Sequence, residues 1–240
     1  MTDRTRMSAL VTILSALPGL ALTSRLRPKG AAIWWSFGLG WVALGVVFGL
    51  GGLLLERRGP GLVGPLEQSF LWAAIPEETA KLLGLLLVAR KHPQSVLRLS
   101  VALSLGFASA ESIVFALRGG VQSALVHTLF AVPAHAAFGA IMGRFLSADR
   151  PPALAILSAW AAAVTVHGIY DWPLFTIAAG AGSALIVSLW AGLVFNLMRW
   201  TWIQVRYTGE DVIPIPEPRS TLPSVPPPPA PRPGTRALRN

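Results

Sequence analysis

The stretch "EQSFLWAAIPEETAKLLGLLLVA", residues 67–89, is apolar and long enough to cross a membrane, yet it holds two adjacent carboxylates and a lysine. About 20 apolar residues in a helix cross roughly 30 Å of hydrocarbon. An ionised side chain at the centre of such a helix costs about 2.5–3.5 kcal/mol on insertion scales. A membrane helix that keeps Glu77, Glu78 and Lys81 therefore needs partners for these charges from elsewhere in the chain.

The composition of the whole chain agrees with a membrane location. Of the 240 residues, 53% are hydrophobic and only 13% are charged, well below the quarter that is usual in soluble proteins. The chain has no cysteine, which excludes disulfides and thiolate metal sites. Any site chemistry must therefore use carboxylates, imidazoles and other oxygen or nitrogen groups.

The hydropathy pattern predicts an all-α, polytopic bundle of transmembrane helices. About seven apolar stretches approach the length needed to span a bilayer. They are separated by Arg, Lys, Pro and Gly and cover residues 8–24, 31–55, 67–89, 99–117, 121–146, 152–173 and 175–198.

Residues 1–206 are predicted to form one integral membrane domain, and its core motifs lie within 67–175. The stretch 8–24 is short and follows two arginines, so a cleaved signal peptide is an open alternative that would leave six spans. Residues 207–240 are rich in Pro, Arg, Ser and Thr. This composition predicts a disordered Pro-rich tail.

The distribution of positive charge argues against nucleic acid as a partner and for a lipid bilayer. The net charge is +9, but the basic residues lie in short clusters between apolar runs and in the tail. Cytoplasmic loops of membrane proteins are enriched in Lys and Arg. The pattern therefore predicts an outside amino terminus and a cytoplasmic tail in a multi-pass protein of the cell membrane. The basic residues that decide this orientation are Arg25, Arg27, Lys29, Arg90, Lys91, Arg98, Arg144, Arg150, Arg199 and Arg206.

Ionisable residues recur inside four of the predicted spans. The acids are Glu77, Glu78, Glu111 and Asp171, and their combined insertion cost approaches about 10 kcal/mol before any pairing. At 1.5 Å per residue, one residue from each of the four spans lies roughly 9–21 Å below the outer surface, namely Glu77, Glu111, His135 and His167. We therefore expect them to meet in one polar cluster. The other ionisable members are Lys81, His135 and His167.

Helical spacing within two motifs supports this convergence. Glu77 and Lys81 are four residues apart, so they share a helix face and can pair. Glu78 is expected to point about 100° away from that face. His167 and Asp171 are also four residues apart. Both members of each four-residue pair can therefore face the same cavity.

Two further histidines have simpler interpretations. His127 lies near the outer end of a predicted span and is expected to be an interfacial or packing residue. His92, in "RKHPQ", is expected to lie in a loop. A Glu77–Lys81 pair taken alone would also be compatible with a structural ion pair, so it is the convergence from four helices that indicates function.

Four motifs, in this order and in separate predicted helices, resemble those of the PrsW family of intramembrane proteases. They are "EETAK" (Glu77, Glu78, Lys81), "FASAE" (Glu111), "PAHAAFG" (His135) and "HGIYD" (His167, Asp171). PrsW proteins are related to the CAAX prenyl proteases, whose motifs are E-E-x-x-x-R, F-x-x-x-H and H-x-x-x-N. This chain has Glu111 in place of the second-motif histidine and Asp171 in place of the asparagine, which favours PrsW-type substrates over prenylated ones.

The resemblance implies a membrane-embedded peptidase that cuts membrane-anchored proteins, such as anti-sigma factors, near the extracytoplasmic face. It implies Glu77 as the base that activates water, with Glu78 assisting. His167, oriented by Asp171, would stabilise the oxyanion or shuttle the proton. His135 and Glu111 complete the set of candidate catalytic residues.

The sequence leaves open whether a metal takes part. Two histidines and one carboxylate form a chemically sensible zinc site, and the candidate ligands are His135, His167 and Glu111, or Glu78 in place of Glu111. The chain has no H-E-x-x-H motif, and activation of water by a glutamate without metal is the alternative. Two other classes also stay open, an ion- or proton-coupled transporter and a non-catalytic scaffold of the same superfamily. The oligomeric state is not indicated.

Overall fold

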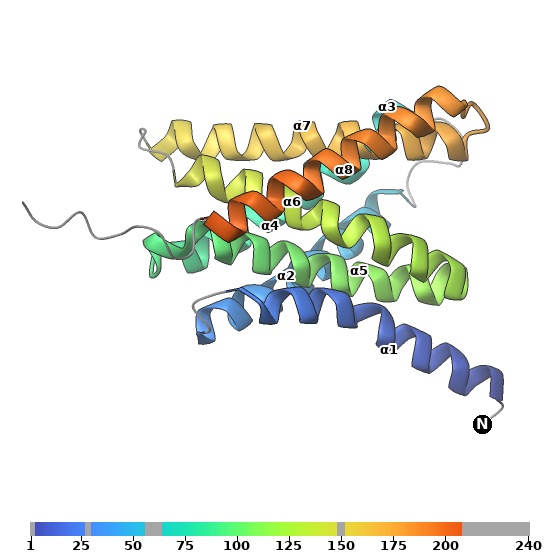
Figure 1. Cartoon of the computed structure of the whole chain (residues 1–240), viewed down its shortest axis with the longest axis horizontal. Coiled ribbons are helices and arrows are strands. Elements are labelled where there is room, and N and C mark those ends of the chain that lie inside the picture. Colours follow the sequence, from blue (N-terminus) through green and yellow to red (C-terminus); the bar gives the residue numbers. More distant parts are fainter. Residues whose placement is uncertain (1–2, 27–29, 56–63, 148–151, 208–240) are drawn as a thin grey trace, which may run out of the picture. The chain divides into compact units, whose positions relative to one another are not determined.

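The computed structural model describes residues 3–26, 30–55, 64–147 and 152–207, and every regular element in these ranges is a helix (Figure 1). The expected all-α class is therefore confirmed. The predicted tail lies outside the described residues, apart from Tyr207. The helices are α1 (Asp3–Ser24), α2 (Ala31–Leu55), α3 (Pro65–Glu67), η1 (Gln68–Ala74), α4 (Ile75–Ala89), η2 (Pro93–Ser95), α5 (Val96–Val126), η3 (His127–Ala131), α6 (Val132–Leu146), α7 (Pro152–Ala178) and α8 (Ala184–Tyr207).

Four described segments are long and apolar enough to cross a membrane: Ala31–Leu50, Pro93–Leu146, Pro152–Ala178 and Ala184–Gln204. The predicted number of about seven spans is not confirmed. The second segment is 54 residues long and is not one straight helix, because Gly120 has a φ of 68° that interrupts it. Glycine adopts this left-handed conformation without the steric cost that a Cβ would bring.

The boundary between the last two spans differs from the prediction. The pattern ends one span at Pro173, but Pro173 lies inside α7 and the helix continues to Ala178. Gly180, with a φ of 81°, ends the helix. The amide of Gly180 bonds to the carbonyl of Ile177 and that of Ala181 bonds to the carbonyl of Thr176, the pair of bonds that defines a Schellman motif. The glycine, and not the proline, is thus the stop signal.

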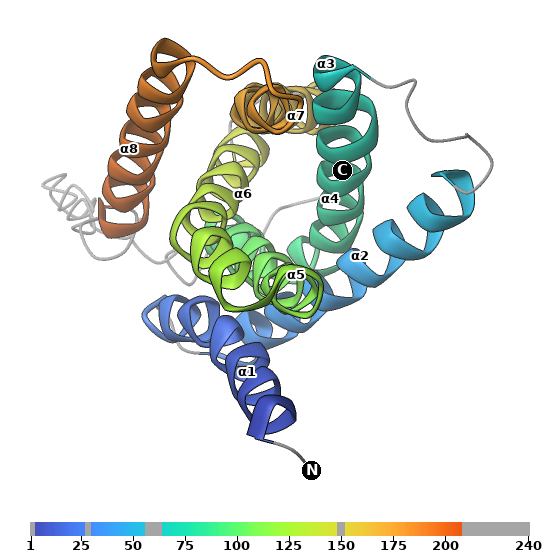
Figure 2. The ribbon, with the colours of Figure 1, turned by 90° about the vertical axis from the view of Figure 1, so that its right-hand side faces the viewer.

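Helix α5 is the centre of the described bundle, and α1, α2, α4 and α6 pack around it (Figure 2). Its residues 99–112 are all buried. Many of them are Ala, Ser or Gly, which lets neighbouring helices approach closely. At Gly106 an added Cβ would overlap the backbone of Phe37 on α2, and at Gly40 it would overlap the backbone of α5.

Gly45 and Gly49 are four residues apart on α2, a spacing that predicts close packing against a neighbouring helix. This prediction is wrong for the described bundle, because a Cβ added at either position would have no neighbouring atom within 4 Å. The crossing instead uses Gly40. Small residues four positions apart indicate a helix face that can pack closely against another helix. They do not indicate which of several such faces makes the contact.

Two π-helical turns shape the walls of the site. η1 ends immediately before Ile75-Pro76, and η3 ends immediately before Val132-Pro133. A proline lacks an amide proton and its ring clashes with the carbonyl four residues earlier, and the wider π turn accommodates both effects within a continuous helix. Each proline is followed within two residues by a site residue, Glu77 or His135.

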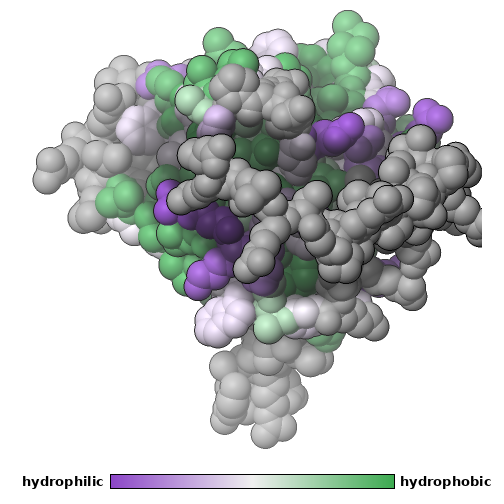
Figure 3. Space-filling view, turned by 90° about the vertical axis from the view of Figure 1, so that its left-hand side faces the viewer, coloured by the Kyte–Doolittle hydropathy of each residue, from purple (hydrophilic) through white to green (hydrophobic). Residues whose placement is uncertain are grey.

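Several of the described basic residues lie where α4 and α6 end and α5 begins, whereas Arg118 is exposed near the other end of α5. Figure 3 faces this end and shows hydrophilic side chains among apolar surface. Arg90, Lys91 and Arg144 are exposed there. His92 is also exposed, in the short connection between α4 and η2, so its expected loop position is confirmed.

Candidate active site

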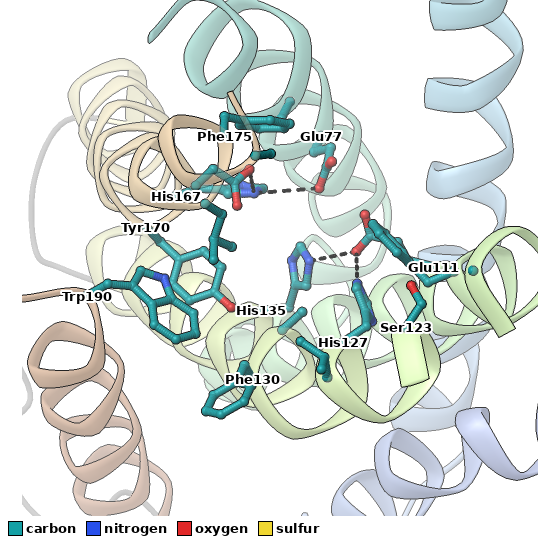
Figure 4. A pocket seen from close by; sticks show the side chains of 18 of the residues that line it. Glu77, Glu111, Ser123, His127, Phe130, His135, His167, Tyr170, Phe175 and Trp190 are labelled. Carbon is teal, nitrogen blue, oxygen red and sulfur yellow. Dashed lines mark hydrogen bonds and ion pairs between the residues drawn. The ribbon is translucent and has the colours of Figure 1, made fainter. Parts of the chain in front are cut away.

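Four helical segments bring the predicted site residues together in one buried cluster (Figure 4). Residues Glu77, Glu78 and Lys81 come from the first two turns of α4, where the helix restarts after η1. Glu111 comes from α5, His135 from α6, and His167 with Asp171 from α7. The expected convergence of side chains from separate helices is therefore observed.

Lys81 is the centre of the cluster. Its ammonium donates to Glu78 Oε1 at 2.7 Å and to His135 Nδ1 at 2.8 Å, and it lies 3.5 Å from Glu77 Oε2. Its Nζ also lies 4.1 Å from the centre of the Phe107 ring, a favourable position for a cation. Glu78 was expected to point away from Lys81, but it is the closer of the two carboxylates, because residues three apart on a helix are neighbours as well.

His167 lies between carboxylates on both sides of its ring. Nδ1 is 2.8 Å from Glu78 Oε1, and Nε2 is 3.2 Å from Asp171 and 3.9 Å from Glu77. The i, i+4 contact with Asp171 confirms the predicted pairing. Because both ring nitrogens face acceptors, both can donate only when the ring carries two protons.

Glu111 holds a second group of contacts. Its Oε2 lies 2.9 Å from His135 Nε2 and 3.0 Å from His127 Nε2 (Figure 4). His135 connects this group with the first one, because its other nitrogen accepts from Lys81. The contacts therefore run without interruption from Asp171 on α7 to His127 on η3.

His127 is a site residue that the sequence pattern did not reveal. It was expected to be an interfacial or packing residue, but its side chain is buried and contacts Glu111 and Ser112. Only its depth near a span end was visible in the sequence, and the side chain belongs to the first residue of the π turn His127–Ala131. The phenyl ring of Phe115 stacks on the imidazole at 4.4 Å, which holds the ring in place.

The hydrogen bonds of Ser112 determine the arrangement of protons on His127. The Ser112 hydroxyl donates to the carbonyl of Ala108 at 2.8 Å, so its oxygen accepts from His127 Nδ1 at 2.9 Å. A neutral imidazole then presents a lone pair at Nε2, directly opposite Glu111 Oε2. Two acceptors face each other at 3.0 Å, so a proton or a cation must lie between them.

A cavity of about 580 Å³ adjoins the cluster. Glu77, Glu111, His127, His135, His167 and Asp171 lie on its wall, whereas Glu78 and Lys81 do not. Most of the remaining lining is apolar and comes from η3, α7, α8 and the region around the Gly120 turn. The arrangement is thus an acid–base centre with an adjoining apolar chamber, the general form of a site that binds an organic substrate.

Two sets of side chains have the geometry to hold a metal ion. Glu77, Glu78, His135 and His167 form one set, and Glu111, His127 and His135 form the other, with ligand atoms in each set within 4.8 Å of one another. The ammonium of Lys81 already lies inside the first set and would repel a cation. The second set has two imidazoles and one carboxylate, a donor set that zinc accepts, and the facing acceptors of His127 and Glu111 fit a cation between them. Of the two trios expected from the sequence, the one with Glu78 lies within the first set, whereas the one with Glu111 is divided between the two sets.

The fold and the site together define a class of protein, a polytopic helical membrane protein with a buried centre of carboxylates and imidazoles suited to acid–base chemistry. Residues 28–199 match the family described as PrsW family intramembrane metalloprotease. The chain belongs to this family and is an intramembrane protease. The matched range contains every site residue named above.

Similar proteins from bacteria carry the name Protease PrsW. The one from Geobacillus kaustophilus is 31% identical over 171 residues, which is 65% of this chain and 76% of that protein. The one from Bacillus subtilis is 30% identical over 131 residues, 50% of this chain and 60% of that protein. The match to the Halalkalibacterium halodurans protein is 38% identical over 87 residues, 34% of this chain and 40% of that protein. No solved structure is significantly similar to the chain. The bacterial relatives and the apolar helices support a multi-pass bacterial membrane protein.

Proposed function

We propose that this protease hydrolyses membrane-anchored protein substrates, of the kind represented by anti-sigma factors, near the extracytoplasmic face of the membrane. The catalytic role in this proposal rests on the position and the contacts of the Glu77 side chain. Its Oε2 is buried and has no hydrogen-bond partner among the described residues, while the side chain lies on the cavity wall. The carboxylate therefore has acceptor capacity that no described residue uses, and the part of the side chain that is exposed, 10%, lies on the cavity wall, where it can accept a hydrogen bond from water.

Glu77 is the general base, and Glu78 is a positioning residue. Glu78 is fully buried, does not line the cavity, and bonds to Lys81 and His167. Glu77 removes a proton from water, and the resulting hydroxide oxygen forms a bond to the carbonyl carbon of the peptide. When the peptide C–N bond breaks, the leaving nitrogen receives this proton from Glu77.

His167 stabilises the negative charge that develops on the carbonyl oxygen. Its ring lies on the cavity wall, and its Nε2 faces both Asp171 and Glu77. Asp171 and Glu78 bind opposite sides of the ring and keep both nitrogens protonated and correctly oriented. A positive charge that is already in place beside the cavity before the reaction needs no reorganisation in the transition state.

Metal binding is supported by the donor set of Glu111, His127 and His135. Zinc bound there would act as a Lewis acid and lower the pKa of a bound water. Binding through His135 Nε2 would release the proton that this nitrogen donates to Glu111, because Lys81 occupies the other nitrogen. Ser112 would orient His127 as an outer-shell partner.

The orientation of the chain is part of the proposal. Exposed basic residues lie at the end of the bundle where α4 ends, and residues around the Gly120 turn, at the far end of α5, line the cavity. The positive-inside rule assigns the basic end to the cytoplasm. The cavity then opens towards the extracytoplasmic side, where a membrane-anchored substrate exposes its juxtamembrane segment.

The test is reconstitution of the purified chain in liposomes with single-span proteins of the anti-sigma-factor type, which expose a juxtamembrane segment on the extracytoplasmic side. Mass spectrometry of the products locates the cleaved bond. We expect cleavage within or next to the extracytoplasmic half of the span, and its loss in Glu77→Gln at unchanged membrane insertion. Equal cleavage by Glu77→Gln would contradict the assigned base, and cleavage confined to the cytoplasmic side would contradict the orientation.

A further inference from the structure

Three aromatic side chains from three helices form one side of the cavity, which we call the aromatic wall. Phe130 comes from η3, Tyr170 from α7 and Trp190 from α8 (Figure 4). The ring centre of Trp190 lies 5.2 Å from that of Phe130 and 5.7 Å from that of Tyr170. All three side chains line the same cavity as the catalytic groups.

The aromatic wall is continuous with the catalytic centre. Phe138 stacks on His167 with ring centres 4.6 Å apart, and its ring centre lies 5.6 Å from that of Tyr170. Each step from His167 to Trp190 is therefore shorter than 6 Å. Since an extended peptide advances about 3.3 Å per residue, a substrate residue within about five positions of the cleaved bond can reach the wall.

Trp190 has a polar group that the described bundle does not satisfy. Its indole Nε1 is buried and has no hydrogen-bond partner among the described residues. A buried donor without a partner costs roughly 1–3 kcal/mol, and buried indole N–H groups are usually paired. A peptide carbonyl that enters the cavity would supply the missing acceptor after a small rotation of the indole, because Nε1 itself is shielded in this structure.

The side of α8 that carries Trp190 is distinct from its outward side. Val194, one turn after Trp190, is buried against Phe138 and Tyr170. Leu189 and Phe195 are each about two-thirds exposed on the outward side, at 66% and 67%. The indole is thus directed into the bundle and the cavity, whereas the exposed side chains have the apolar character of a surface that faces lipid.

We propose that the aromatic wall is a specificity pocket for a bulky apolar side chain of the substrate's membrane segment, and that Trp190 donates its indole proton to a backbone carbonyl of the same segment. The proposal rests on the proposed function, because it places the substrate relative to Glu77 and His167. Aromatic rings cannot replace the hydration of a carboxylate. Acidic residues are therefore rejected at this substrate position.

The test uses the full chain in phosphatidylcholine–phosphatidylglycerol nanodiscs and synthetic single-span peptides with a Leu-rich membrane segment. Each position around the cleaved bond is occupied in turn by Phe, Leu, Ala or Asp, and mass spectrometry measures the site and rate of cleavage. At one fixed position within about five residues of the bond, we expect the Phe or Leu peptides to be cut at least about tenfold faster than the Ala or Asp peptides.

Three variants separate the pocket from the general packing of α8. Trp190→Phe keeps a ring but lacks the donor, so we expect an unchanged preference and a KM raised about fivefold at constant kcat. Trp190→Ala is expected to remove the preference for bulky residues. Trp202→Phe, on the same helix at a side chain that is 58% exposed, is the matched control and should behave as the parent chain. The proposal is overturned if Trp190→Ala keeps the parent preference, and if that variant does not fold, an unchanged KM in Trp190→Phe has the same meaning.

A second readout does not depend on cleavage. Peptides that carry photoleucine at the scanned positions are irradiated with the Glu77→Gln chain, and crosslinks are mapped by mass spectrometry. Crosslinks to the aromatic wall support the pocket, and crosslinks confined to exposed residues such as Leu185 and Leu189 overturn it. Crosslinks to the wall without cleavage by the parent chain would instead remove the proposed function and leave the pocket intact.

Discussion

Replacement of Lys81 by methionine is the perturbation whose cost the structure defines best. The ammonium is fully buried and bonds to Glu78 and His135, with Glu77 at 3.5 Å. Methionine has a similar volume and is apolar, so Lys81→Met leaves the packing nearly intact. It removes the ammonium charge and leaves buried carboxylates without their main partner.

Removal of one partner from a buried ion pair destabilises a protein by about 3–5 kcal/mol, because the remaining charge stays buried without compensation. Glu78 is also fully buried, so water cannot replace the lost hydrogen bond without opening the helix contacts. We therefore expect the upper part of this range. A loss of about 4–5 kcal/mol corresponds to a shift of about three to three and a half orders of magnitude in the unfolding equilibrium.

The assay is titration of the purified chain with sodium dodecyl sulfate in mixed micelles, followed by tryptophan fluorescence. The matched control is Lys91→Met, because Lys91 is exposed directly after α4 and should change the free energy of unfolding by less than about 0.5 kcal/mol. The double variant Lys81→Met/Glu78→Gln removes both charges. We expect it to recover about 2 kcal/mol relative to Lys81→Met, a coupling typical of residues in direct contact.

A loss below about 1 kcal/mol in Lys81→Met would refute the placement of Lys81 as the main counter-charge of the cluster. Strict additivity of Lys81→Met and Glu78→Gln would refute their direct contact. Both results are measured as free energies of unfolding and do not depend on any substrate.

Three further predictions concern other parts of the molecule. Asp171→Asn should lower kcat about 10²-fold or more with little change in KM, because it removes a charge that orients His167; equal kcat values for the two chains in the liposome cleavage assay would contradict this role. His127→Gln should weaken zinc binding at least about 10- to 100-fold in a competition titration with a chromophoric chelator, and an unchanged affinity would exclude His127 as a ligand. Gly106→Ala should destabilise the bundle by about 1–3 kcal/mol because its Cβ overlaps Phe37. Gly45→Ala, at a position with no neighbouring atom within 4 Å, should be neutral or stabilising by up to about 1 kcal/mol. Similar effects of the two glycine variants in the detergent titration would contradict the assigned crossing point of α2 and α5.

The sequence by itself determined the class of fold and most members of the site. A helix in lipid must satisfy its backbone hydrogen bonds within its own segment, so apolar length predicts helices without knowledge of tertiary contacts. The insertion cost of Glu77, Glu111 and His167 marks them as functional for the same reason. Their depth along each predicted span was enough to indicate that they meet.

The tertiary structure alone decided which side chains contact one another and which helix faces are used. Spacing along one helix reports neighbours within that helix, but the rotation of a helix against its partners depends on packing with segments far away in sequence. For this reason the contact of Lys81 with His135 and that of His127 with Glu111, each between different helices, could not be read from the sequence pattern. The aromatic wall also required tertiary structure, because Phe130, Tyr170 and Trp190 come from three helices whose packing brings their rings into contact.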